Sequence, residues 1–330
     1  MRWSEEKAME WYAGIDWLVG FNYVTTSAVN STEMWQPETF DEPAIRRELA
    51  LAATAGYNAC RVFLPFLVWH MQHESFMQNW ELFLTISAEY GLFVMPVLFD
   101  DCAFADKDAY TGPQDTPVPG VHNSGWTPSP GRAIADDPSM EPALAAYVHE
   151  IIGTYATDSR IVFWDLYNEP GASAREDGCI PLLENTFRWA REVSPSQPLT
   201  ACLWRFDFAA YEQLALALSD VISYHDYKNL AESEQIAQTL AQHNRPMICS
   251  EWLHRPQGNT FETHLPLFKR MKIASFHWGL VLGKTQTNLS WETMTGTPDA
   301  NPDLWQHDVF HPNLRPYRPE EMAFLREITK

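Results

Sequence analysis

Residues 161–170 read IVFWDLYNEP, a run dominated by apolar and aromatic side chains that ends in Asn168, Glu169 and Pro170. Short runs of this composition predict a buried β-strand. The amide and the carboxyl group follow the run directly, so both are expected at the carboxyl end of that strand. The segment therefore predicts a buried strand that delivers polar groups to one edge of a sheet.

Similar runs recur on both sides of this one, and longer segments with helical spacing or loop composition separate them. This alternation predicts βα units around a parallel sheet. Eight such units in 330 residues are typical of a (β/α)₈ barrel, the TIM barrel. We therefore expect one catalytic domain over residues 1–330, with strands in residues 17–24, 59–64, 92–99, 161–167, 199–204, 221–225, 246–250 and 273–280.

Helices are legible between some of these strands. Residues 42–56 begin with an acid and a proline and end at Gly56, the start and stop signals of a helix. Residues 142–155 and 182–193 have a similar apolar spacing. Two segments, 100–138 after the third strand and 283–319 after the eighth, are too long for ordinary connections. In a barrel such βα-loops form the active-site face, so we expect both to wall the mouth.

The charge balance limits the classes of partner. Lys and Arg number 23 against 43 Asp and Glu, a formal net charge of −20. Nucleic acid binding needs clustered cations to neutralise phosphates, and the sequence has no Lys/Arg run, so we exclude nucleic acid. Neutral sugars are compatible with an acidic surface. The longest apolar stretch, residues 91–99, is interrupted by Pro96 and is too short for a membrane helix, so we expect no membrane segment.

The N-terminal residues MRWSEEK carry charges where a secretory signal has an apolar core, which predicts a cytoplasmic protein. The five cysteines show no CxxC spacing, so we expect reduced thiols and no cysteine nucleophile. His70 and His73 lie beside Glu74 without a third ligand at a recognisable spacing. We predict neither a metal nor a cofactor, and the sequence specifies no oligomeric state.

The residues expected at the carboxyl ends of the strands are unusually polar, and in a barrel those ends surround the mouth. The set comprises Asn22, Tyr23, Arg61, Asp100, Asp101, Asn168, Glu169, Trp204, Arg205, His225, Tyr227, Glu251, Trp252 and Trp278.

Glu169 and Glu251 form the central pair of this set. They end the fourth and seventh predicted strands, which face each other across a barrel mouth. Two carboxyl groups flanking one bond are what glycoside hydrolysis requires. One must be protonated while the other is ionised, and burial together with a neighbouring cation can create that difference. The pair predicts a glycosidase.

Taken together, Arg61, Asn168-Glu169-Pro170, His225-Asp226-Tyr227, Glu251 and Trp278 resemble the clan of retaining (β/α)₈ glycosidases typified by glycoside hydrolase family 5, the cellulase-like proteins. The likeness spans nearly the whole chain. It implies that Glu169 is the general acid/base, that Glu251 is the nucleophile and that Asn168 binds the sugar 2-hydroxyl group.

The same resemblance implies supporting roles. Arg61 and Tyr227 would orient Glu251 and keep it ionised, His225 would contact the acid/base or a sugar hydroxyl, and Trp278 would form the floor under the cleaved sugar. The chain departs from the clan after the third strand, where Asp100-Asp101 replaces a histidine that is common in family 5. This departure leaves the identity of the sugar open.

Further candidates for substrate binding come from strand ends and loops. Tryptophan side chains are frequent in sugar sites, and polar side chains bind hydroxyl groups. We expect this role for Asn22, Glu33, Trp35, Asp100, His122, Asn123, Trp204, Trp252 and Lys284, and place the loop residues Trp126 and Trp291 near the ligand as well.

These residues predict a retaining β-glycoside hydrolase acting by double displacement, with exo-action favoured because long loops wall the mouth. An endo-acting β-glucanase, xylanase or mannanase on the same site remains an alternative. A metal-dependent sugar isomerase would use Glu169, Glu251, His225 and Asp100 as ligands. A barrel that binds carbohydrate without catalysis is the third alternative.

Overall fold

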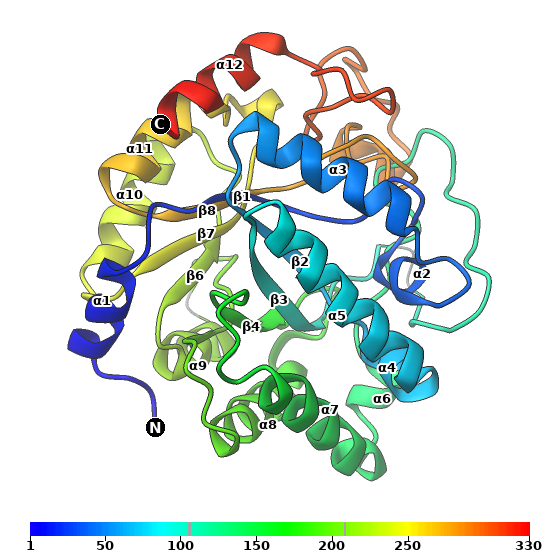
Figure 1. The fold of residues 1–330 in the computed structure, drawn as a ribbon, viewed down its shortest axis with the longest axis vertical. Helices are drawn as coiled ribbons and strands as arrows, with labels where there is room; N and C mark the ends of the chain where they lie inside the picture. Colours follow the sequence, from blue (N-terminus) through cyan, green and yellow to red (C-terminus); the bar gives the residue numbers. More distant parts are fainter. Residues whose placement is uncertain (105–106, 208) are drawn as a thin grey trace.

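The computed structural model describes residues 1–104, 107–207 and 209–330, and Figure 1 shows a ring of strands surrounded by helices. Eight parallel strands pair in the order β5-β4-β3-β2-β1-β8-β7-β6. A parallel bridge between Leu203 and Tyr224 joins β5 to β6 and completes the ring. The predicted (β/α)₈ barrel is confirmed. The strands are β1 Val19–Asn22, β2 Ala59–Phe63, β3 Phe93–Asp100, β4 Trp164–Asn168, β5 Leu199–Thr200, β6 Ile222–His225, β7 Met247–Trp252 and β8 Ala274–His277.

Helices follow the strands around the outside of the ring (Figure 1). The predicted helix at residues 42–56 is present as α3, where the Asp41 side chain accepts from the Ala44 amide and Gly56 ends the helix with a φ of 107°. The α-helices are α1 Glu5–Ala13, α2 Ser31–Trp35, α3 Glu42–Ala55, α4 Phe66–Met71, α5 His73–Glu89, α6 Arg132–Ala135, α7 Glu141–Thr154, α8 Ile180–Glu192, α9 Ala210–Leu218, α10 Leu230–Ala241, α11 Phe261–Arg270 and α12 Pro319–Ile328.

Inward-facing side chains fill the barrel in layers. Near the amino ends of the strands an apolar layer includes Met95, Phe163, Ile248 and Phe276. Gly20 belongs to this region, because a Cβ there would lie 2.6 Å from the Phe276 ring. Toward the carboxyl ends, the interior side chains become polar and charged, and this change positions the functional groups at the mouth.

The expected strand at residues 199–204 is shorter in the structure. Regular pairing with β4 covers only Leu199 and Thr200, and the chain then continues irregularly, with Leu203 alone bridging to β6. This irregular stretch carries Cys202 and Trp204 toward the mouth. Among the described residues, no helix is long and apolar enough to cross a membrane.

The long segments after β3 and β8 contact each other above the barrel. The amide of His122 donates to Thr293 Oγ1 at 2.9 Å, and the amide of Asn123 donates to the Thr285 carbonyl at 2.8 Å. In Figure 1 the teal segment runs along the right of the ring, and the orange segment lies at its upper right. These two contacts join the segments beside the mouth.

Candidate active site

Glu169 follows β4 directly and has an unusual backbone. Its φ is 39°, in the left-handed region that residues other than glycine rarely adopt. Its backbone amide donates to Cys202 Sγ at 2.9 Å, and the next turn closes through the amide of Ala172, which donates to the Glu169 carbonyl. This turn directs the Glu169 side chain into the barrel mouth.

Glu251 lies within β7 and is 5% exposed. Arg61 Nη1 donates to its Oε1 at 2.8 Å, and the Tyr227 hydroxyl donates to its Oε2 at 2.8 Å. Both carboxylate oxygens therefore accept a hydrogen bond, one of them from a permanent cation. Donors of this kind stabilise the ionised form and fix its orientation.

Arg61 is fully buried in β2 and connects several strands. Besides Glu251, its guanidinium group donates to Asp165 Oδ2 at 2.8 and 3.0 Å. It also donates to Asn22 Oδ1 at 2.7 Å and to Asn168 Oδ1 at 2.6 Å. Because Asp165 already pairs with it, the buried cation is compensated independently of Glu251. The side chain of Asn168 is thereby held in one orientation.

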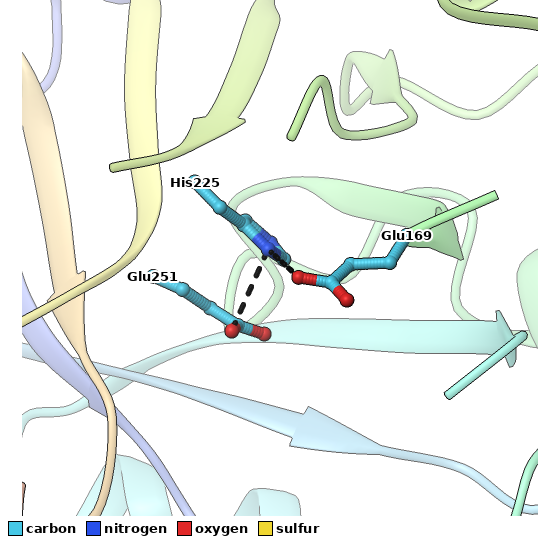
Figure 2. Close-up of side chains that lie close together, drawn as sticks. All are labelled: Glu169, His225 and Glu251. Atoms are coloured by element: carbon cyan, nitrogen blue, oxygen red, sulfur yellow. Dashed lines mark hydrogen bonds and ion pairs between the residues drawn. The ribbon is translucent and has the colours of Figure 1, made fainter. Parts of the chain in front are cut away.

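His225, at the end of β6, lies between the two carboxyl groups, as Figure 2 shows. Its Nδ1 is 2.7 Å from Glu169 Oε1 and 3.5 Å from Glu251 Oε2. One ligand-type atom from each of the three side chains lies within 4.8 Å of the others. An oxygen of each carboxyl group therefore faces the other across a short gap bridged by the imidazole.

The environments shift the two carboxyl pKa values in opposite directions. Burial raises the pKa of Glu169, but the hydrogen bond and charge of His225, with the Cys102 thiol, outweigh it and hold that pKa below its usual range. Burial dominates at Glu251 and raises its pKa, and the negative Glu169 adds to the effect, while His225, Arg61 and Tyr227 oppose it. Protonation of one carboxyl group is thus linked to the charge of the other.

A cavity of about 650 Å³ opens above this pair. Its walls come from the loops that follow the strands, including the joined segments after β3 and β8. The predicted site residues that line it are His122, Asn123, Trp126, Asn168, Glu169, Trp204, His225, Tyr227, Glu251, Trp278 and Trp291.

Two buried polar atoms in this wall have no hydrogen-bond partner among the described residues, Asn123 Oδ1 and His225 Nε2. Buried polar groups are normally paired. Both belong to residues that line the cavity, so a bound hydroxyl group would satisfy them.

Other predicted site residues lie beneath or beside the cavity. Asn22 donates to the Ser250 carbonyl and accepts from Arg61. Asp100 accepts from the side-chain Nδ2 of Asn168 at 2.8 Å and from the Trp126 indole at 2.7 Å. Neither lines the cavity, and both orient residues that the mechanism would use.

Glu33 and Lys284 were expected at the ligand, and the structure pairs them with each other instead. Lys284 Nζ lies 2.7 Å from Glu33 Oε1, and Glu33 Oε2 accepts from the Val29 amide. This ion pair joins the segment after β1 to the segment after β8, outside the residues that line the cavity.

The prediction that Trp35 and Trp252 lie near the ligand is wrong. Trp35 packs on Trp80 and Phe83 in the core between barrel and helices. Trp252 is fully buried and packs on the aromatic face of α11. Side chains alternate along a strand, so a strand that turns Glu251 inward turns Trp252 outward.

Several cavity residues escaped sequence analysis. Cys102 lines the cavity, and its Sγ lies 2.9 Å from Glu169 Oε2. His254 and His307 join the wall from the segments after β7 and β8, and Phe104 and Phe206 lie at its edge. Their separation in the chain gives no local signal, although the position of Cys102 just after a predicted strand end could have identified it.

The group formed by Glu169, His225 and Glu251 has the composition of a cation site. However, the oxygens of Glu251 already accept from Arg61 and Tyr227. Asp100, the fourth ligand of the isomerase alternative, is directed to Asn168 and Trp126. These side chains suit a hydrogen-bonded network better than a divalent cation, because the guanidinium group of Arg61 already donates to the Glu251 carboxylate that would have to coordinate the ion.

Solved structures share this fold at low sequence identity. Exo-beta-1,4-mannosidase Op5Man5 from Opitutaceae bacterium strain TAV5 is 17% identical with a TM-score of 0.64, over 95% of this chain and 59% of that one. A GH5_18 variant from Streptomyces cattleya in complex with Manβ1-4GlcNAc is 12% identical with a TM-score of 0.60, over 94% and 79%. The beta-glucuronidase of Bacteroides uniformis is 13% identical with a TM-score of 0.57, over 93% and 35%.

These likenesses show the fold, and this chain spans only 59% of the Opitutaceae mannosidase. The expected resemblance to a family 5-like clan of (β/α)₈ glycosidases is confirmed by the barrel and by a family match. Residues 33–278, which contain the carboxyl pair and most of the residues around it, match the family model described as glycosyl hydrolases family 2, TIM barrel domain. The chain belongs to this family of glycoside hydrolase barrels.

Proposed function

We propose that the protein is a retaining β-glycoside hydrolase. The observation that carries this proposal is the short gap between Glu169 and Glu251, whose nearest oxygens lie within 4.8 Å. Retaining glycosidases keep their carboxyl groups about 5–5.5 Å apart, whereas inverting ones need about 6.5–9.5 Å for a water molecule. The gap supports a direct attack on the sugar by one of the two carboxylates.

Glu251 is the nucleophile in this proposal because Arg61 and Tyr227 both donate to it. It attacks the anomeric carbon while Glu169 protonates the departing oxygen, and a glycosyl ester forms on Glu251. Glu169 then removes a proton from water, which attacks the same carbon and releases Glu251. Asn168, fixed by Arg61 and Asp100, would hold the sugar 2-hydroxyl.

The first step requires a protonated Glu169. The charge and hydrogen bond of His225 lower the pKa of this group in the empty site. Burial by itself raises the pKa of Glu169, in the direction that the first step needs. We infer that the productive complex pairs a protonated Glu169 with an ionised Glu251.

The cavity wall supports exo-action on a neutral sugar. The segments after β3 and β8 are hydrogen-bonded to each other and border the cavity on one side. Among the described lining residues, Lys228 is the single Lys or Arg, whereas Glu169, Glu232, Glu251 and Glu292 are acidic. A uronate would meet mainly carboxylates, so a neutral β-hexoside is the favoured class. Asn123 Oδ1 and His225 Nε2 are available for its hydroxyl groups.

The proposal is tested with p-nitrophenyl β-glycosides of glucose, mannose, galactose, xylose, N-acetylglucosamine and glucuronic acid. We expect hydrolysis of a neutral glycoside, with the β-anomer of the sugar as the first product detected by proton NMR. This hydrolysis should be lost in Glu251→Ala. Glu81→Ala, a surface carboxylate paired with Arg160, is the control. The α-anomer as first product would refute retention.

Assays with oligosaccharides and free sugars, together with sugar-binding measurements, separate the alternatives. Turnover of oligosaccharides only, with internal cleavage, would indicate an endo-enzyme. Activity that a chelator removes and a divalent cation restores would favour the isomerase. Sugar binding without turnover would indicate a carbohydrate-binding barrel.

A further inference from the structure

The turn after β3 is hydrogen-bonded to the end of β4 and to the turn that follows it. Asp100 Oδ1 accepts from Asn168 Nδ2 at 2.8 Å and from the Cys102 amide at 2.9 Å. Asp101 donates its amide to the Asn168 carbonyl at 3.3 Å, and its Oδ2 accepts from the Gly171 amide at 2.8 Å. Cys102 is thereby fixed beside the strained backbone of the acid/base.

The Cys102 side chain completes this contact. Its Sγ lies 2.9 Å from Glu169 Oε2, while His225 Nδ1 lies 2.7 Å from Oε1 of the same carboxyl group. Cys102 is 6% exposed and lines the cavity. Each oxygen of Glu169 therefore has its own neighbour, a histidine on one side and a thiol on the other.

Cys102 is held in the thiol form. Burial raises its pKa well above the usual range, and the negative charges of Glu169 and Asp100 raise it further. A thiol donates a weak hydrogen bond through its proton and accepts a weak one through its sulfur. It can therefore contact a carboxylate as donor and a carboxylic acid as acceptor.

We propose that Cys102 is a positioning residue for Glu169, keeping its carboxyl group aligned in both protonation states of the catalytic cycle. This inference rests on the proposed function. Glu169 must be protonated in the first step and ionised in the second. A strong fixed donor would favour the ionised form alone, whereas the weak thiol allows the change in both directions.

Other titratable and charged groups face Glu169 from the neighbouring strands, and replacing Cys102 removes none of them. They are Arg61 in β2, Asp100 in β3, Cys202 after β5, His225 in β6 with Tyr227 after it, and Glu251 in β7.

The test measures kcat/KM against pH for Cys102→Ser and Cys102→Ala with aryl β-glycosides that the wild type hydrolyses. A serine hydroxyl stabilises ionised Glu169 more strongly, so the basic limb should move to lower pH. The alanine variant removes a hydrogen bond that lowers the pKa of Glu169, so that pKa should rise and the basic limb should move to higher pH.

Leaving groups provide the second readout. Dinitrophenolate departs without protonation, whereas an alkyl alcohol or a sugar needs the acid. We expect Cys102→Ala to lose about tenfold in kcat/KM on the poor leaving group and less than about twofold on the good one. Cys60→Ala, which removes a buried thiol from β2 within the core, is the control. It should change neither the pH profile nor the ratio of kcat/KM between the two leaving groups.

If kcat/KM falls equally on all leaving groups and the pH profile does not move, Cys102 acts only through packing and the inference is overturned. If Cys102→Ala fails to fold by circular dichroism, the direction of the pH shift in Cys102→Ser decides. Wild-type inactivity toward every glycoside would instead overturn the proposed function itself, and the inference with it.

Discussion

Glu251 and Glu169 face the same cavity but are held by different kinds of neighbour. Glu251 accepts from a permanent cation and from a phenol, Arg61 and Tyr227. Glu169 contacts the imidazole of His225 and the thiol of Cys102, which are groups that can either donate or accept a hydrogen bond. The fixed donors suit a group that stays ionised, and the variable ones suit a group that gains and loses a proton. In our proposal, this difference in surroundings assigns the two roles.

The largest effects should come from removing each carboxyl group in turn. We expect Glu251→Ala and Glu169→Ala both to lose at least about 10⁴-fold in kcat on a substrate with a poor leaving group. Azide should then distinguish them, because it fills the gap left by either side chain on opposite faces of the sugar. Glu169→Ala should yield the β-glycosyl azide and Glu251→Ala the α-glycosyl azide, identified by NMR.

Arg61→Lys tests the fixed half of the comparison. A lysine ammonium is a compact point charge without the planar fork of the guanidinium group, so it does not reproduce the hydrogen bonds to Glu251, Asp165 and Asn168 together. We expect kcat/KM to fall by about 10²- to 10³-fold, the scale of losing a preorganised donor. Arg160→Lys, on the surface beside Glu81, is the matched control and should stay near wild type. A loss below threefold for Arg61→Lys would contradict the role given to Arg61.

His225→Gln tests the variable half. His225 lowers the pKa of both Glu169 and Glu251. Without it both pKa values rise, so both limbs of the profile, which report the coupled carboxyl pair, should move together to higher pH. We expect a shift on the order of one pH unit in the kcat/KM profile. Movement of either limb to lower pH would be inconsistent with this arrangement.

The smallest effect on activity is expected outside the pair. Trp35→Phe removes a core indole that donates to the Phe63 carbonyl, and should lower the free energy of unfolding by about 1–2 kcal/mol in urea denaturation. Its KM should stay within about twofold of wild type. Trp278→Phe, at the cavity, should raise KM several-fold with little change in stability. A raised KM in Trp35→Phe with an unchanged KM in Trp278→Phe would mean that the sugar binds elsewhere.

Sequence analysis located all eight strands and both carboxyl groups, because apolar runs and the polar residues after them are local signals. It also expected His225, Tyr227 and Asn168 at the mouth, where the structure places them. It failed for Trp35 and Trp252, since the side of a strand or helix that a tryptophan faces depends on its packing partners. Alternation from Glu251 could have corrected Trp252. The contact of Cys102 with Glu169 depends on how two turns meet, which no local pattern encodes.

The buried guanidinium group of Arg61 also bears on the order in which the chain assembles. Its partners lie in β1, β4 and β7, at Asn22, Asp165 and Glu251. During synthesis, Asp165 leaves the ribosome 86 residues before Glu251. A half-made barrel can thus already neutralise its internal cation, while the complete hydrogen-bond set forms only when the last strands close the ring. Recovery of activity after refolding therefore reports ring closure and not merely the formation of helices and strands.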